Sequence, residues 1–148
     1  MSTTRSAGYS GTPLPRKLGI KPAARVALLG APEGFDRTLG SLPEDVTVSR
    51  RLGRRPFNVI VAFFVRRSVL ERRLPPLTAA LDRSGGLWLA WPKRASAVAT
   101  DLSDNVVRDL GLAAGLVDNK VCAIDQVWSG LRLVYRLRDR PLGGTTAP

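Results

Sequence analysis

A short loop is the first place in this chain where residue types and spacing allow ligand chemistry. In VALLGAPEGF, residues 26–35, an apolar run is followed by small residues and one acid: Gly30, Ala31, Glu33 and Gly34. Small residues after a strand let the backbone approach a cofactor, as in the glycine-rich turns of dinucleotide-binding folds. Pro32 removes one backbone N–H that could bind an anion. The loop is a candidate ligand-binding turn, and a purely structural turn is the competing interpretation.

A second candidate lies in WPKRAS, residues 91–96, which follows another predicted strand. Open α/β sheets bind ligands beyond the carboxyl ends of their strands. There Lys93 could meet a phosphate and Trp91 could stack on a ring. We expect both residues to line one ligand cleft with the loop at 30–34. The alternative is a strand terminus with solvated charges and a tryptophan that covers the core.

Features that accompany a working cofactor loop are replaced in this chain. The acid that would hold ribose hydroxyls at the end of the second strand gives way to Ser49-Arg50-Arg51, and arginine suits a phosphate better than a ribose. A polar motif after the central strand gives way to residues 63–65, Phe-Phe-Val. The absence of histidine and the single cysteine, Cys122, remove the commonest general base and the ordinary zinc sites. We therefore predict no catalytic residue, no metal and no cofactor, and a protein that is not an enzyme.

The net charge of +11 is concentrated in the first part of the chain. Residues 1–83 hold 15 basic and 6 acidic groups, a balance of +9, whereas residues 84–148 hold 8 and 6, a balance of +2. Such a field attracts nucleic acid or an acidic protein partner. The candidate surface for either is formed by arginines that flank predicted strand ends: Arg50, Arg51, Arg54, Arg55, Arg66 and Arg67. A solvated basic face without a partner is the alternative.

Hydrophobic periodicity predicts helices that alternate with strands. We expect strands at 25–30, 45–52, 57–64, 87–91, 115–125 and 130–138, and helices at 12–20, 66–81 and 100–112, with one or two helical turns within 31–43. This order predicts a single three-layer α/β domain with a mostly parallel sheet and a C-terminal antiparallel hairpin. The strands at 25–30 and 57–64 should be central, parallel neighbours. Residues 51–56 are too few for a helical crossover, so the second and third strands are either antiparallel or joined by an extended return, which we favour.

Several local expectations follow from residue type. Thr12 should cap the first helix and Gly19 should end it. Pro75-Pro76 should kink or restart the helix at 66–81, and Ser84-Gly85-Gly86 should stop it. Asp118 and Lys120 should share one face of a strand. Cys122 should be a buried, unreactive thiol.

Composition also predicts domain limits and location. Residues 1–11 read as a flexible N-terminal arm, 12–140 as the domain, and 141–148 as a flexible tail. No segment is apolar enough to span a membrane, and the N-terminus does not look like a signal peptide. With one cysteine, this predicts a cytoplasmic protein.

Two resemblances support this layout. The order of elements over about residues 25–138, with its closing helix, strand and hairpin, resembles class I methyltransferase-like Rossmann folds. The amino-acid sequence from residue 8 to 140 resembles a family of small bacterial proteins catalogued as domain of unknown function 3052. The segments that carry this resemblance are GYSGTPLPRKLGIKP, VALLGAPEGF, GLWLAWPKRAS, VATDL, GLVDNKVCAID and WSGLRLVYRLRDR. The family resemblance implies one domain and adds no catalytic residue.

Three function classes remain open. The first is a non-catalytic binding or regulatory module. The second is a small-ligand or nucleotide binder, including a ligand like S-adenosylmethionine. The third is a low-specificity nucleic-acid binder that uses the six arginines.

Overall fold

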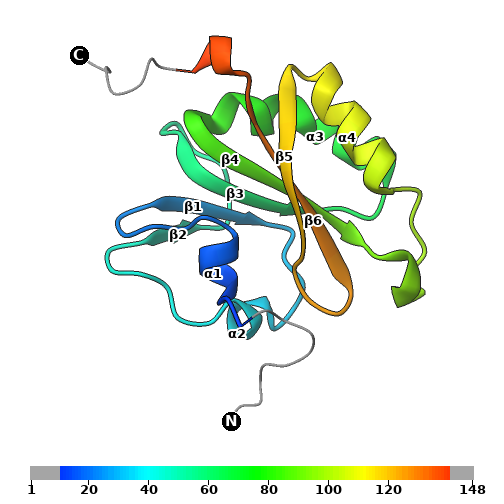
Figure 1. Ribbon diagram of the computed structural model, residues 1–148, viewed down its shortest axis with the longest axis horizontal. Coiled ribbons are helices and arrows are strands. Elements are labelled where there is room, and N and C mark those ends of the chain that lie inside the picture. Colours follow the sequence, from blue (N-terminus) through cyan, green and yellow to red (C-terminus); the bar gives the residue numbers. More distant parts are fainter. Residues whose placement is uncertain (1–10, 141–148) are drawn as a thin grey trace.

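One apolar strand lies at the centre of the sheet in the computed structural model, which describes residues 11–140 (Figure 1). This strand, β3 (Phe57–Phe63), pairs in parallel with β1 (Arg25–Leu29) and with β4 (Leu81–Pro92). The described sheet has the order β2-β1-β3-β4-β6-β5. In it β2 (Thr47–Ser49) is parallel to β1, while β6 (Trp128–Tyr135) is antiparallel to β4 and to β5 (Leu116–Ala123). The predicted mostly parallel sheet with an antiparallel C-terminal hairpin is confirmed.

Helices cover both faces of the sheet, which confirms the predicted three layers (Figure 1). Along β1, Val26 and Leu28 face one layer and Ala27 and Leu29 face the other. The first layer contains α1 (Leu14–Lys17) and α2 (Phe35–Leu39). The second contains α3 (Arg67–Ala80) and α4 (Asp104–Ala113). Period-two alternation in the strands therefore builds two separate apolar clusters.

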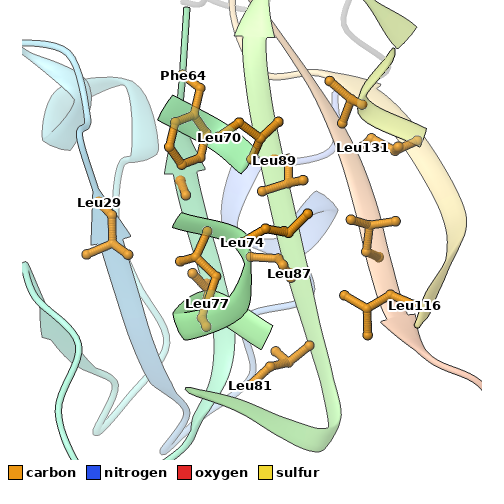
Figure 2. Close-up of a cluster of buried hydrophobic side chains, with 14 of the residues drawn as sticks. Leu29, Phe64, Leu70, Leu74, Leu77, Leu81, Leu87, Leu89, Leu116 and Leu131 are labelled. Carbon is orange, nitrogen blue, oxygen red and sulfur yellow. The ribbon is translucent and has the colours of Figure 1, made fainter. Parts of the chain in front are cut away.

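The cluster under α3 depends on leucines spaced three and four residues apart. Leu70, Leu74 and Leu77 point from α3 onto the sheet, against Leu87 and Leu89 of β4 (Figure 2). The predicted restart at Pro75-Pro76 is wrong, because α3 is one helix of 14 residues. Both prolines are exposed, so the backbone carbonyls that lose their N–H partners lie on the solvent side, where water can bond them.

The predicted turn at Ser84-Gly85-Gly86 is also wrong, because these residues lie inside β4. The β3–β4 register shifts between the pairs Phe57–Leu81 and Val59–Gly86, so β4 carries a bulge there. A Cβ on Gly85 would lie 2.5 Å from the carbonyl oxygen of Asn58. The glycine therefore serves a close approach of two strands, which sequence alone reads as a turn.

The link from β2 to β3 is the extended return that we favoured. Both strands are parallel to β1, which lies between them, and no helix occurs in residues 50–56. The Arg25 guanidinium holds the end of this link by donating to the carbonyl oxygens of Arg55 and Pro56 at 3.2 and 3.0 Å.

Two further local expectations need correction. The register of β5 against β6 shifts between Asp118 and Lys120. Because of this bulge, Asp118 bonds Arg108 of α4, while Lys120 bonds the Lys17 carbonyl on the opposite side of the sheet. The first helix has Pro13 rather than Thr12 at its N-cap, whereas Gly19, with φ of +82°, ends it as expected.

The expected arm and tail fall outside the described residues, apart from Gly11. Within residues 11–140, no helix combines the length and apolar character that a membrane crossing requires.

Trp88 provides a first test of the packing. Its side chain is fully buried, and its indole Nε1–H donates to the Leu18 carbonyl oxygen at 3.0 Å, which joins β4 to the end of α1. Trp88→Phe leaves that carbonyl unpaired and opens space, so the free energy of unfolding should fall by about 2–4 kcal/mol. Urea unfolding measures the loss. Trp128→Phe is the comparison, because the half-buried Trp128 contacts the Phe63 ring and phenylalanine keeps an aromatic ring there. It should lose less, and an equal loss would contradict the assignment.

Gly111 provides a second test, in which packing and helix propensity predict opposite signs. Alanine is better than glycine inside a helix by roughly 1 kcal/mol. Here a Cβ would lie 2.6 Å from a methyl group of Leu133, which is fully buried. Gly111→Ala should therefore destabilise the protein by about 1–3 kcal/mol. Gly53, where a Cβ has open space, should tolerate alanine, and a more stable Gly111→Ala protein would refute this packing.

Candidate functional site

The strand order places the topological switch point of the sheet at the carboxyl ends of β1 and β3, and we call the region beyond these two strand ends the crevice. β1 lies between β2 and β3, so the chain winds outward in opposite directions from this point, where open α/β sheets bind ligands. Gly30 follows β1 with φ of +69°, and a Cβ there would lie 3.1 Å from the Phe63 carbonyl oxygen. Gly30 therefore serves a close approach of this loop to β3, which its positive φ also favours; the predicted approach to a ligand stays a prediction.

The rest of the loop turns directly into α2. Gly34 takes φ of +83° at the N-cap of this helix of five residues, and no side chain caps it. Glu33 is exposed and Ala31 is partly buried against the α1–α2 layer. The Phe35 ring meets the edge of the Phe63 ring, with 5.0 Å between centroids. This contact fixes the start of α2 against the end of β3.

The rim of the crevice at β2 is held by a cation where a ribose-binding acid would be expected. Ser49 Oγ donates to the Arg51 carbonyl oxygen at 2.6 Å, which makes a tight local turn. The Arg50 guanidinium forms an ion pair with Asp36 of α2 at 2.7 Å. Both side chains are well exposed, so the pair is accessible to a competing anion.

The end of β3 is apolar and closed by hydrogen bonds from the segment before α4. Phe63 and Phe64 are both buried. Thr100 Oγ1 donates to the Val65 carbonyl oxygen at 2.5 Å, and Asp101 accepts the Arg67 backbone N–H at 2.7 Å. The Asp101 carboxylate therefore accepts the first backbone N–H of α3, while Ser103 caps α4 by accepting the Val106 N–H.

The end of β4 does not share a described cavity with the loop. Trp91 is 5% exposed and belongs to the α3–α4 core, which favours the covering role over ring stacking. The Lys93 backbone N–H donates to the Val127 carbonyl oxygen at 2.7 Å. A cavity of about 600 Å³ opens here, with Trp91, Arg94 and Ser103 among its lining residues and none of residues 30–34. Since β3 separates β1 from β4, the two halves of the predicted cleft lie about 10 Å apart.

The six arginines are all exposed but do not form one surface. Arg50, Arg51, Arg66 and Arg67 follow the carboxyl ends of β2 and β3. Arg54 and Arg55 precede β3, at the other end of the sheet, and the length of β3 separates the two groups by roughly 20 Å. Arg50 and Arg67 are ion-paired, the latter with Glu71 at 2.9 Å. A single polyanion cannot contact all six without bridging both edges.

Cys122 is half-buried in β5. Burial raises the pKa of its thiol, against the opposing effect of Lys17 and Lys120. A raised pKa lowers the thiolate fraction, which agrees with the expected low reactivity, although the residue is less buried than predicted.

Comparisons with known proteins identify the fold. No protein-family model matches the chain, and no curated protein is similar in sequence. Among solved structures, a SAM-dependent methyltransferase from Aquifex aeolicus matches with a TM-score of 0.59 at 13% identity, covering 80% of this chain and 85% of that one. Magnesium protoporphyrin IX methyltransferase from Synechocystis, solved with bound SAH, matches with a TM-score of 0.54 at 12% identity over 78% and 75%. A putative methyltransferase from Thermoplasma acidophilum gives 0.54 at 8% over 80% and 71%.

These matches confirm the methyltransferase-like Rossmann fold. They do not confirm membership in the small bacterial family that the sequence resembles, because no family model matches. At such identities the likeness shows the fold, and the residues at the crevice must carry any statement about function.

Proposed function

We propose that this protein is a non-catalytic binding module that holds a phosphate-bearing nucleotide in the crevice between the carboxyl ends of β1 and β3. The observation that carries the proposal is Arg50, which stands at the end of β2 and is paired with Asp36 at 2.7 Å.

The fold supports a nucleoside ligand at this place. The neighbours named above are methyltransferases of the same fold, and one was solved with SAH. Gly30 has no side chain, so a nucleoside could approach the backbone closely at this turn. The small residues at 30–31 and the exposed Glu33 would border the nucleoside.

The charge at the rim supports a phosphate. A carboxylate at the end of β2 would accept hydrogen bonds from ribose hydroxyls, whereas a guanidinium donates two parallel bonds to a phosphate. The Arg50–Asp36 pair is exposed, and exposed pairs contribute little to stability. A phosphate can therefore replace Asp36 as the partner of Arg50 at small cost, with Arg51 beside it.

The apolar end of β3 supports a role in binding rather than catalysis. Phe63, Phe64 and Val65 offer no side-chain proton acceptor, and the Val65 carbonyl is already bonded to Thr100. None of these three side chains could act as a general base on a bound nucleotide.

A ligand panel tests the proposal by thermal unfolding. ATP, ADP, AMP, S-adenosylmethionine and S-adenosylhomocysteine are added in turn, and binding at 100 times the dissociation constant should stabilise the protein by about 2.7 kcal/mol. We expect stabilisation by the phosphorylated nucleotides, and we expect the double variant Arg50→Gln/Arg51→Gln to lose most of the stabilisation that the monophosphate AMP gives.

The matched control is Arg72→Gln/Arg73→Gln, which removes the same charge from two consecutive exposed arginines of α3. Its response to nucleotides should equal that of the unaltered protein. Stabilisation by S-adenosylmethionine alone, unchanged in the Arg50/Arg51 variant, would overturn the phosphate assignment. Methyl transfer from that compound to any acceptor would overturn the non-catalytic role.

A further inference from the structure

The opposite edge of the sheet, where β1, β3 and β4 begin and β6 ends, holds its arginines in a different way. Near the carboxyl edge and on α4, Arg50, Arg67 and Arg108 are paired with carboxylates. At the amino edge, several arginine side chains are held by backbone carbonyls and aromatic rings, although Arg138 lies 3.9 Å from the Asp139 carboxylate. Arg83 donates to the Asp139 carbonyl oxygen at 3.3 Å and lies 4.6 Å from the centroid of the Tyr135 ring.

The side chains of Arg25 and Arg140 are held in the same way as that of Arg83. Arg25 donates to two backbone carbonyls and lies 4.7 Å from the centroid of the Phe57 ring. Arg140 donates to the Tyr135 carbonyl oxygen at 2.6 Å. Carbonyl and ring partners fix the position of a guanidinium without cancelling its charge. This edge therefore presents cations that are held in place and still carry their full charge, the condition for binding an anion at low entropic cost.

Arg132 of β6 is the innermost of these cations, and Gly86 makes room for it. A Cβ on Gly86 would lie 2.7 Å from Cζ of Arg132, and its nearest contacts are all atoms of that guanidinium. The guanidinium is partly buried, and its hydrogen bond to Asn119 is long, at 3.4 Å. None of the ion pairs in the described part of the chain includes Arg132.

The groups around Arg132 do not neutralise its positive charge. Burial, and secondly the positive charge of Arg140, lower the pKa of Arg132. A partly buried cation with a cationic neighbour is costly to the free protein, and an anion that bound there would relieve this cost.

A cavity of about 410 Å³ adjoins this guanidinium, and we name it the amino-edge pocket. Lys21, Asn58, Ser84 and Arg132 supply polar groups to its wall, which includes no carboxylate. Asn58 Oδ1 accepts the Arg25 backbone N–H at 2.8 Å, which leaves its amide NH₂ as a donor. Ser84 Oγ donates to Asp82, which lies outside the lining. The wall thus offers two cations and an amide donor.

We propose that the amino-edge pocket is a second binding site, which takes the terminal phosphate of a small oligophosphate. Arg132 and Lys21 hold that phosphate inside the pocket. The exposed arginines along the same edge, Arg54 and Arg55 among them, attract the phosphates that follow. This site is independent of the crevice at the carboxyl edge, from which the length of the sheet separates it.

Isothermal titration with sodium tripolyphosphate at low salt tests the site directly. The titration is repeated on the Arg50→Gln/Arg51→Gln protein, in which the phosphate site proposed for the crevice is removed, and there we expect one equivalent to bind, more tightly than inorganic phosphate. Arg132→Gln should weaken binding by about tenfold or more, the effect of removing one charge-assisted contact. Lys21→Gln, at an exposed position outside the strands, should weaken it by about fivefold.

Gly86→Ala tests whether the position of the Arg132 charge matters, independently of the net charge of the protein. The added methyl displaces the Arg132 guanidinium and leaves the net charge unchanged, so it should weaken binding about as much as Arg132→Gln. Arg73→Gln, on the exposed surface of α3, removes one charge far from the pocket and should change affinity by less than about twofold. Circular dichroism checks that each variant is folded. If the Gly86→Ala protein does not fold, the effect of Lys21→Gln on tripolyphosphate affinity tests the site instead.

Three results would overturn the proposal. One is the absence of tripolyphosphate binding to the unaltered protein. Another is an equal loss in Arg73→Gln and Arg132→Gln, which would assign the effect to net charge. The third is tighter binding of duplex DNA than of tripolyphosphate with no effect of Gly86→Ala or Lys21→Gln, which would assign the edge to a diffuse polyanion field.

Discussion

Burial of β3 on both faces is the constraint on which the rest of this structure depends. From Val59 to Phe63 no side chain is more than 7% exposed, and successive side chains point into opposite layers. Each layer must therefore cover half of one strand. The α3–α4 layer does so with regularly spaced leucines, whereas the other layer has helices of four and five residues. That thin layer is held by specific contacts, above all the Trp88 hydrogen bond to Leu18 and the Phe35–Phe63–Trp128 ring contacts.

The thin layer also determines what the two edges of the sheet can do. At the carboxyl edge it brings α2 close enough to β2 for Asp36 to pair with Arg50. At the amino edge the link from α1 to β1 is short, so Lys21 and the residues around it form one wall of a pocket whose other wall is the sheet itself. The short helices of this layer thus leave Arg50 paired with a carboxylate at one edge and, within residues 11–140, Arg132 without a carboxylate partner at the other.

The sequence was informative where a property repeats along the chain. The continuous apolar runs of β1 and β3 were enough to predict central strands, and the spacing of Leu70, Leu74 and Leu77 was enough to predict a helix. The Arg50 and Gly30 positions were predicted because they follow such strands. These features are local, so no knowledge of pairing was needed.

Errors arose where a residue serves a neighbour that is distant in sequence. Gly85 and Gly86 resemble a turn, yet they accommodate Asn58 and Arg132, 27 and 46 residues away. Asp101 resembles a cap of the next helix, yet its carboxylate accepts the first backbone N–H of the previous one. The bulge between Asp118 and Lys120 places these two side chains on opposite faces of β5, although regular alternation predicts one shared face. Arg132 went unnoticed for the same reason, since its relation to Gly86 follows from the register of β4 against β6.

The similarity to methyltransferases concerns the fold of the sheet, whereas function depends on the residues at the edges of the sheet. In such a fold the position after β1 must accept a close backbone approach, and Gly30 keeps that property because the Phe63 carbonyl leaves room for no side chain. The position after β2 is free of this steric demand, because the Arg50 side chain is exposed. Its chemistry can change without cost to the fold, and here it has changed from the expected acid to a cation. The proposed site would therefore keep the shape of its fold and replace an acceptor for neutral hydroxyl groups with a donor to an anion.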